Sequence, residues 1–229
     1  MRVKLLKCLL VAIQSKFEYL FRETNLFVSQ TADGVIGLSP KEKRFSGFMN
    51  HLLNNAVIKQ NVFSLCLGQN GGVFSLGGID STLHDREQKV QFLNYKVDEL
   101  YKLELESLFV GDVRISAKVP AGLDTGTTNT YFPKEIFESF YVKLKEICSS
   151  PNFCFGDILK LNDEICFYKK KGISKENFFN SMPKFTFNFK ENVSYTWQPE
   201  SYLYEKDDEF CLSVHKWEYF TNNFIDSKK

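Results

Sequence analysis

The sequence has 229 residues, 43% hydrophobic and 25% charged, which is the composition of a soluble globular protein with a substantial core. The 29 basic and 28 acidic residues leave a net charge of +1 without a basic stripe, so nucleic acid is excluded as an expected partner. The 23 phenylalanines and the recurring β-branched runs favour a mostly-β fold.

The N-terminus begins with the basic segment Met1–Lys7, which leads into the apolar segment Cys8–Ile13. This pattern resembles a signal peptide with a short apolar core and no small-residue cleavage site. A buried strand or helix is the alternative interpretation. No apolar run in the sequence is long enough to span a bilayer, so no membrane span is expected.

A helix is predicted to start at Ser39, with Pro40 in its first turn and Glu42 completing a capping box. Apolar residues at three- and four-residue spacing extend it to Ala56, so one face should be buried. Two short apolar runs then flank a glycine-rich turn and predict a hairpin of residues 62–67 and 73–76.

The next segments again favour strands. Residues 101–108 alternate apolar and polar, and Gly111-Asp112 should turn the chain into another short strand. Residues 184–189 alternate as well, and residues 193–197 can pair with them. After Pro133 a second amphipathic helix should bury one side made of Ile136, Phe137, Phe140, Tyr141, Leu144 and Ile147. Many short strands without a βαβ rhythm predict an antiparallel, mostly-β architecture.

One segment, residues 119–128, presents a carboxylate on a turn of small residues after an apolar strand. Its centre is Asp124-Thr125-Gly126, a triplet that average composition yields in roughly one chain in twenty of this length. Taken alone, the triplet is also consistent with a surface turn in which Asp124 caps its own loop. The neighbouring segments therefore decide the interpretation.

These neighbours follow a set order along the chain: A-D-G-V-I-G-L-S (32–39), F-S-L-C-L (63–67), G-G-V-F-S-L-G-G-I-D (71–80), Y-K-L-E-L-E-S-L-F-V-G (101–111), L-D-T-G-T-T-N-T-Y-F-P (123–133), M-P-K-F-T-F-N-F (182–189) and Cys211. This order and spacing resembles the pepsin-like aspartic proteases, family A1, from the middle of their first lobe onward. The segments E-T-N-L-F-V-S-Q (23–30) and W-Q-P-E-S-Y-L-Y (197–204) look most like the plasmepsin V branch, whose members are processing proteases of the parasite endoplasmic reticulum.

The resemblance implies a pepsin-like acid protease fold with part of the first lobe and most of the second. Residues 1–96 would be a remnant of the N-terminal lobe with connecting strands, and residues 97–229 a C-terminal lobe lacking its last strands. It also implies an aspartic-type endopeptidase that acts on polypeptides without a cofactor, as a monomer, in the secretory pathway or the endoplasmic reticulum.

In that family two aspartates share one proton and hold the water that attacks the peptide bond. By resemblance, Asp124 is the catalytic aspartate of the second lobe, and Thr125 hydrogen-bonds to the matching loop of the other lobe. Gly126 lets backbone amides donate toward the carboxylates. Thr127 holds the Asp124 carboxylate in place, and Thr128 contacts the substrate backbone.

The sequence departs from the family because no first Asp-Thr/Ser-Gly and no tyrosine-bearing flap precede Ala32. The chain is therefore interpreted as a fragment, a mispredicted gene product or a degenerate relative, inactive as given. A non-catalytic peptide-binding or scaffold protein and a self-associating enzyme with two Asp124 loops are the alternatives. A lone Asp124 is expected to titrate near its usual pKa of about 4.

The resemblance also implies a disulfide between Cys166 and Cys211, and Cys148 with Cys154 can close a smaller loop. Cys8 and Cys66 stay unassigned, with Cys66 interpreted as a core or disulfide cysteine. No C-x-x-C pair occurs and the three histidines lie far apart, so no metal site is expected. Asn192-Val193-Ser194 is a glycosylation acceptor pattern, in keeping with a secretory route.

Overall fold

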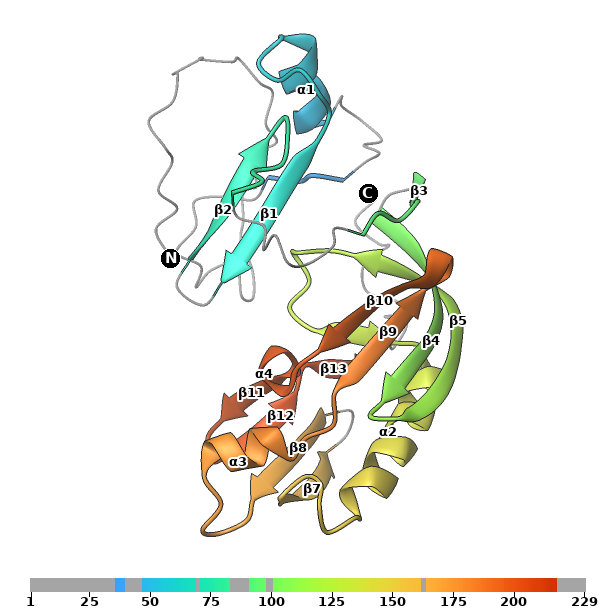
Figure 1. Ribbon diagram of the computed structural model, residues 1–229, viewed down its shortest axis with the longest axis vertical. Helices are drawn as coiled ribbons and strands as arrows, with labels where there is room; N and C mark the ends of the chain where they lie inside the picture. The colour runs from blue at the N-terminus through green and yellow to red at the C-terminus, as the bar shows by residue number, and fades with distance from the viewer. Residues whose placement is uncertain are drawn as a thin grey trace, which may run out of the picture. The chain divides into compact units, whose positions relative to one another are not determined.

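The computed structural model describes residues 36–39, 47–68, 71–82, 91–97, 101–161 and 164–217. The chain divides into two compact units, Met1–Gln91 with Val97–Leu100, and Phe92–Lys96 with Tyr101–Lys229. Strands dominate the described residues, which confirms the predicted mostly-β fold (Figure 1). None of the helices within those residues is long and apolar enough to cross a membrane.

The first unit contains helix α1 (Phe48–Asn54) and the antiparallel hairpin of β1 (Phe63–Gly68) and β2 (Gly71–Leu76). The hairpin was predicted, and Gly68 pairs with Gly71 at its closed end. A small core of Met49, Leu52 and Ile58 packs with the half-buried Leu38, Phe48, Leu53 and Phe63.

Residues 40–46, with Pro40 and Glu42, lie outside the described residues, but the prediction of one helix from Ser39 onward was wrong, because α1 begins at Phe48 and its N-cap Gly47 has a non-helical ψ of 158°. The C-terminal end of the prediction was wrong. Helix α1 stops at Asn54, and Ala56 has a φ of 54°, a left-handed conformation that cannot continue an α-helix.

The second unit is built on a sheet in the order β10 (Val193–Trp197), β9 (Phe185–Phe189), β4 (Tyr101–Val110) and β3 (Lys96–Val97), with β5 (Val113–Leu123) also paired to β4 (Figure 1). The β4–β5 turn contains Gly111 at a φ of 56°, in the region that favours glycine. Strand β5 has 11 residues, so the expected short strand is in fact long. Strand β4 has a bulge at Glu106, where the register of its pairing with both β5 and β9 shifts.

Helix α2 (Lys134–Cys148) packs against β4 and β5, following β6 (Thr130–Phe132) and the residue Pro133 (Figure 1). The helix was predicted after Pro133, and its apolar side is confirmed. Ile136, Phe137, Phe140 and Leu144 are buried, while Tyr141 and Ile147 pack against the same core as half-buried residues.

A second sheet has the order β11 (Leu203–Lys206), β12 (Glu209–Leu212), β8 (Glu164–Lys169) and β7 (Gly156–Leu161). Two short helices, α3 (Lys175–Asn180) and α4 (Pro199–Tyr202), and the 3-10 turn Lys190–Asn192 connect the strands. Strand β13 (Val214–Lys216) pairs in parallel with β6. None of these elements was predicted.

A chain of aromatic rings runs through the core of the second unit. The ring centroids of Phe140 lie 5.5 Å from Phe132 and 5.0 Å from Phe185, and Phe185 stacks on Tyr202 at 4.0 Å. The Tyr202 hydroxyl donates a 2.5 Å hydrogen bond to the carbonyl of Pro183, which satisfies its one polar atom inside the core.

Two disulfides reinforce the second unit. Cys166 and Cys211 face each other on paired strands β8 and β12, and Cys148 at the end of α2 is bonded to Cys154. Both expected pairings are therefore present. The interpretation of Cys66 as a core or disulfide residue was wrong, because it lies exposed and unbonded on β1, and Cys8 lies outside the described residues.

Candidate active site

Asp124 lies directly after a strand, β5, as predicted, and stands on the loop that leads to β6. The start of this loop is fixed by the sheet, where Leu123 pairs with Tyr101 of β4. Its end is fixed by a 2.8 Å hydrogen bond from the Thr130 amide to the carbonyl of Ser213. Because both ends are bound to regular structure, the loop presents an exposed Asp124 from a defined position.

The Asp124 carboxylate is oriented by its own loop. The Gly126 amide donates a 2.9 Å hydrogen bond to Oδ1, and the Thr127 hydroxyl donates a 2.6 Å hydrogen bond to Oδ2. The Thr127 amide also donates to the Asp124 carbonyl at 3.4 Å, which closes the turn. Each carboxylate oxygen therefore has one donor and keeps further lone pairs for another molecule.

Glycine at position 126 has a steric reason. A Cβ built there would lie 3.2 Å from Asp124 Oδ1, which is closer than nine in ten real Cβ contacts. A side chain would push the carboxylate away from the amide that binds it. The glycine thus permits the short contact between backbone and carboxylate.

These hydrogen bonds hold the pKa of Asp124 below its ordinary value of 3.8. The Thr127 hydroxyl has the largest effect, the Gly126 amide the next, and partial burial acts in the opposite direction. The expectation of an unperturbed pKa was therefore wrong, because the sequence does not reveal that two donors of the same loop converge on the carboxylate. Asp124 is ionised at neutral and mildly acidic pH.

The other residues of the motif do not hold the carboxylate. Thr125 and Thr128 are exposed, and neither is a partner of Asp124 in the described part of the chain. Within the same residues no second carboxylate contributes to the pKa of Asp124. Two pockets of the second unit are lined by residues of other segments.

A second polar cluster was missed by the sequence analysis. Glu164 on β8 accepts hydrogen bonds from the Tyr204 hydroxyl at 2.6 Å and the Lys206 ammonium at 2.8 Å, both on β11. The Lys206 bond, followed by the Tyr204 bond, lowers the pKa of Glu164. Burial, and then Glu164, raises the pKa of Tyr204 to about 12. The sequence offers no local signal for this cluster, because Lys206 lies in a charged run and Glu164 stands about 40 residues before Tyr204 and Lys206.

Glu164 also lies near Cys166 and Cys211, with potential metal-ligand atoms within 4.8 Å of one another. The two sulfurs are bonded to each other, so they are not thiolates that can bind a metal ion. The cluster of Glu164, Tyr204 and Lys206 instead joins β8 to β11 across the sheet, next to the disulfide.

The sequence profile of the eukaryotic aspartyl proteases matches residues 9–223. The chain belongs to this family, and its mostly-β architecture is the pepsin-like fold, as the sequence motifs predicted.

Two curated relatives show how far the similarity extends. Aspartic protease 5 of Toxoplasma gondii is 36% identical over 64 residues, which are 27% of this chain and 7% of that protein. Plasmepsin V of Plasmodium falciparum, isolate 3D7, is 19% identical over 273 aligned positions, which cover 85% of this chain and 46% of that protein. The chain thus spans less than half the length of plasmepsin V.

Proposed function

We propose that this chain contributes Asp124 as the second-lobe catalytic aspartate of an aspartic-type endopeptidase, and that it does not cleave peptides by itself. The observation that carries the proposal is the Asp124 loop. It presents an exposed, oriented carboxylate whose two oxygens accept hydrogen bonds of 2.9 and 2.6 Å from Gly126 and Thr127. Membership of the aspartyl protease family supplies the chemistry in which such a carboxylate takes part.

In that chemistry one ionised carboxylate takes a proton from water as the water attacks the peptide carbonyl. A second, protonated carboxyl group polarises the carbonyl and shares the proton. Asp124, with its lowered pKa, fits the ionised member of such a pair. The described residues place no other carboxylate against it, so half of the catalytic machinery has to come from elsewhere.

The remaining roles in the loop and the lobe boundaries belong to the same proposal. Thr125 contacts the facing loop of the other lobe, and Thr128 contacts the substrate backbone. Residues 1–96 form part of the N-terminal lobe and residues 97–229 the C-terminal lobe. The division of the chain into compact units near residues 91–101 supports this boundary.

We also propose that the chain resides in the secretory pathway or the endoplasmic reticulum, as a monomer. The two disulfides support an oxidising compartment, because such bonds are rare in the reducing cytosol. The resemblance to the plasmepsin V branch points to the same compartment.

A non-catalytic relative that binds peptides or acts as a scaffold is the second candidate. The observation that favours it is the lone Asp124, which lacks an opposing carboxylate among the described residues. The two candidates differ in what happens when a second catalytic loop is supplied, since only an enzyme gains Asp124-dependent turnover.

The first experiment offers a mixed peptide library to the purified chain between pH 4 and 7, with Asp124→Asn and, as a matched control, Asp112→Asn. Asp112 is an exposed aspartate in the β4–β5 turn. We expect no enzyme-like hydrolysis by any of the three proteins. Cleavage that only Asp124→Asn abolishes would overturn the inactivity of the isolated chain and support self-association. Cleavage that persists in Asp124→Asn would refute the assignment of Asp124.

A further inference from the structure

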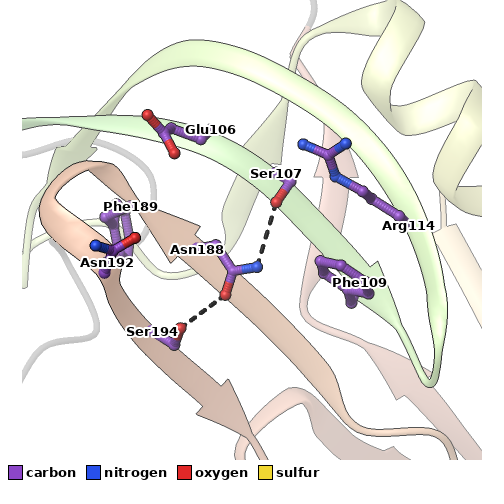
Figure 2. Close-up of a pocket in the computed structure, with 8 residues that line it drawn as sticks. All are labelled: Glu106, Ser107, Phe109, Arg114, Asn188, Phe189, Asn192 and Ser194. Atoms are coloured by element: carbon purple, nitrogen blue, oxygen red, sulfur yellow. Dashed lines mark hydrogen bonds between the residues drawn. The ribbon is translucent and has the colours of Figure 1, made fainter.

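An open pocket of about 330 Å³ lies over the sheet of the second unit, and its lining contains no residue of the Asp124 loop (Figure 2). Its volume is at the lower end of small-molecule sites, which span about 300–1,000 Å³. One side comes from the β4–β5 hairpin and the other from the β9–β10 hairpin. The lining includes Ser107, Arg114, Asn188, Phe189, Asn192 and Ser194.

Asn192 stands at the turn of the β9–β10 hairpin. Glu191 and Asn192 have φ values of 67° and 59°, and this pair of left-handed residues reverses the chain between the two strands. Asn192 is exposed, and among the described residues no side-chain hydrogen bond engages its amide. An exposed, unengaged amide on a tight turn leaves room for an attached sugar in the folded unit.

The sequence around this amide adds a second, independent observation. Asn192-Val193-Ser194 is the only Asn-x-Ser/Thr triplet in the chain, and its middle residue is not proline. We propose that Asn192 is N-glycosylated in the lumen of the secretory route, and that the first sugar packs into the pocket against Phe189. In the cell this requires the lumenal location proposed above.

The reaction is a glycosyl transfer from a lipid-linked oligosaccharide pyrophosphate. The Asn192 side-chain nitrogen forms a bond to C1 of the first N-acetylglucosamine, the bond between C1 and the pyrophosphate oxygen breaks, and the lipid pyrophosphate leaves. The amide nitrogen releases one proton to a base of the oligosaccharyltransferase. No electron is exchanged.

The folded hairpin indicates when this transfer takes place. The Ser194 hydroxyl donates a 2.8 Å hydrogen bond to Asn188 Oδ1, and the Asn188 amide donates to the hydroxyl of the buried Ser107 at 3.3 Å (Figure 2). The transferase has to recognise the Ser194 hydroxyl of the acceptor triplet, but in the folded sheet this hydroxyl is hydrogen-bonded to Asn188. Glycosylation therefore precedes the pairing of β9 with β10.

The pocket offers suitable contacts once the hairpin has closed. Phe189 is half-buried: it packs against the core of the second unit and pairs with Val193 across the hairpin, and it also lines the pocket next to the glycosylated turn. The apolar face of a sugar ring packs on aromatic side chains. The exposed Arg114 and the fixed Asn188 amide supply polar partners for the hydroxyl and acetamido groups.

The test expresses the chain behind a heterologous cleavable signal sequence in a eukaryotic secretory host and measures its mass before and after peptide N-glycosidase. We expect one glycan on the wild type and on Ser194→Thr, and none on Asn192→Gln or Ser194→Ala. Asn180→Gln, an exposed asparagine outside any acceptor triplet, should keep the glycan.

Delivery to the lumen is verified by removal of the signal sequence and formation of the Cys166–Cys211 disulfide. A delivered wild-type chain without a glycan would overturn the proposal. The heterologous signal sequence delivers the chain to the lumen whether or not the native chain goes there. A delivered chain without a glycan therefore refutes glycosylation itself, whereas failure of the native chain to reach the lumen would refute only the proposed location.

The contact with Phe189 is tested on the glycoprotein trimmed by an endoglycosidase to its first sugar. Removal of this sugar should lower the Tm of the wild type, and it should lower the Tm of Phe189→Leu markedly less. Enzymatic removal of the sugar converts Asn192 to aspartate. The unglycosylated Asn192→Asp variant therefore shows how much of the change in Tm this conversion causes by itself. Equal decreases of Tm in both proteins would refute packing of the sugar on Phe189.

Discussion

The Thr127 hydroxyl donates a 2.6 Å hydrogen bond to Oδ2 of Asp124, three residues earlier in the same loop. The same bond fixes the orientation of the carboxylate and favours its ionised form, because a hydrogen-bond donor to a carboxylate stabilises the negative charge. It is formed within the second unit and needs no residue of another lobe. The loop therefore carries an oriented, ionised aspartate even when that aspartate stands alone.

Replacing Thr127 by valine, which has nearly the same shape but no hydroxyl, should raise the pKa of Asp124 toward its ordinary value of 3.8. Thr128→Val is the matched control, because Thr128 is not among the groups that lower this pKa. The measurement is a carboxyl-carbon NMR titration of Asp124 in each protein. Equal titration curves for both variants would show that the hydroxyl does not set the pKa.

The two disulfides should contribute unequally to stability. The Cys166–Cys211 bond spans a sequence separation of 45 residues and the Cys148–Cys154 bond one of 6. The entropy of the closed loop in the unfolded chain corresponds to about 4 kcal/mol for the longer loop and about 2 kcal/mol for the shorter one. Denaturant unfolding of the two double alanine variants measures the difference. A larger loss for Cys148→Ala/Cys154→Ala would contradict the prediction.

Tyr202→Phe should destabilise the second unit by about 1–3 kcal/mol, because the Pro183 carbonyl loses its buried donor. Tyr202 has a relative exposure of only 1% and its hydroxyl bonds to that carbonyl. Tyr195→Phe, at an exposed position of β10, should change the unfolding free energy little. Similar free energies of unfolding for both variants would show that the buried hydrogen bond does not stabilise the core.

Stability should also fall at acid pH. The bonds from Lys206 and Tyr204 lower the pKa of Glu164, and a group of this kind stabilises the fold above its unfolded pKa. The stabilisation by Glu164 is complete above its ordinary, unfolded pKa of about 4.5. It is lost as the pH falls from that value through the lower pKa of Glu164 in the folded state. Glu164→Gln should flatten this part of the stability curve.

The control for this pH dependence is Glu176→Gln, at an exposed position in the first turn of α3. Denaturant unfolding between pH 2 and 7 compares both variants with the wild type. If the free energy of unfolding falls as steeply with decreasing pH below about 4.5 in Glu164→Gln as in the wild type, the prediction is contradicted.

The sequence predicted the elements whose signals are local. Helix α2 follows a proline and repeats its apolar residues at helical spacing, and the β9–β10 hairpin alternates around a polar turn, so both were found close to their observed bounds. Strand β8 was missed because its buried run of Ile165, Cys166 and Phe167 has no alternation. The parallel pairing of β13 with β6 joins segments far apart in sequence and has no local signal.

The site shows the same limits. The motif located Asp124 on a turn after a strand, because the Asp-Thr-Gly turn and the apolar residues before it are contiguous. Its lowered pKa depends on the approach of the Thr127 hydroxyl and the Gly126 amide, which is a matter of loop conformation. The cluster around Glu164 forms between strands about 40 residues apart, which only the folded sheet brings together.

The measurement that tests the central claim most directly supplies the second carboxylate. A chimera joins the plasmepsin V residues that precede its matched region to the N-terminus of this chain, and peptide hydrolysis is measured with Asp124→Asn and Asp112→Asn variants of the chimera. We predict turnover that Asp124→Asn abolishes and Asp112→Asn leaves unchanged. Turnover that is equal in the Asp124→Asn chimera, or a folded chimera that binds peptides without cleaving them, would contradict the assignment of Asp124 as a catalytic aspartate.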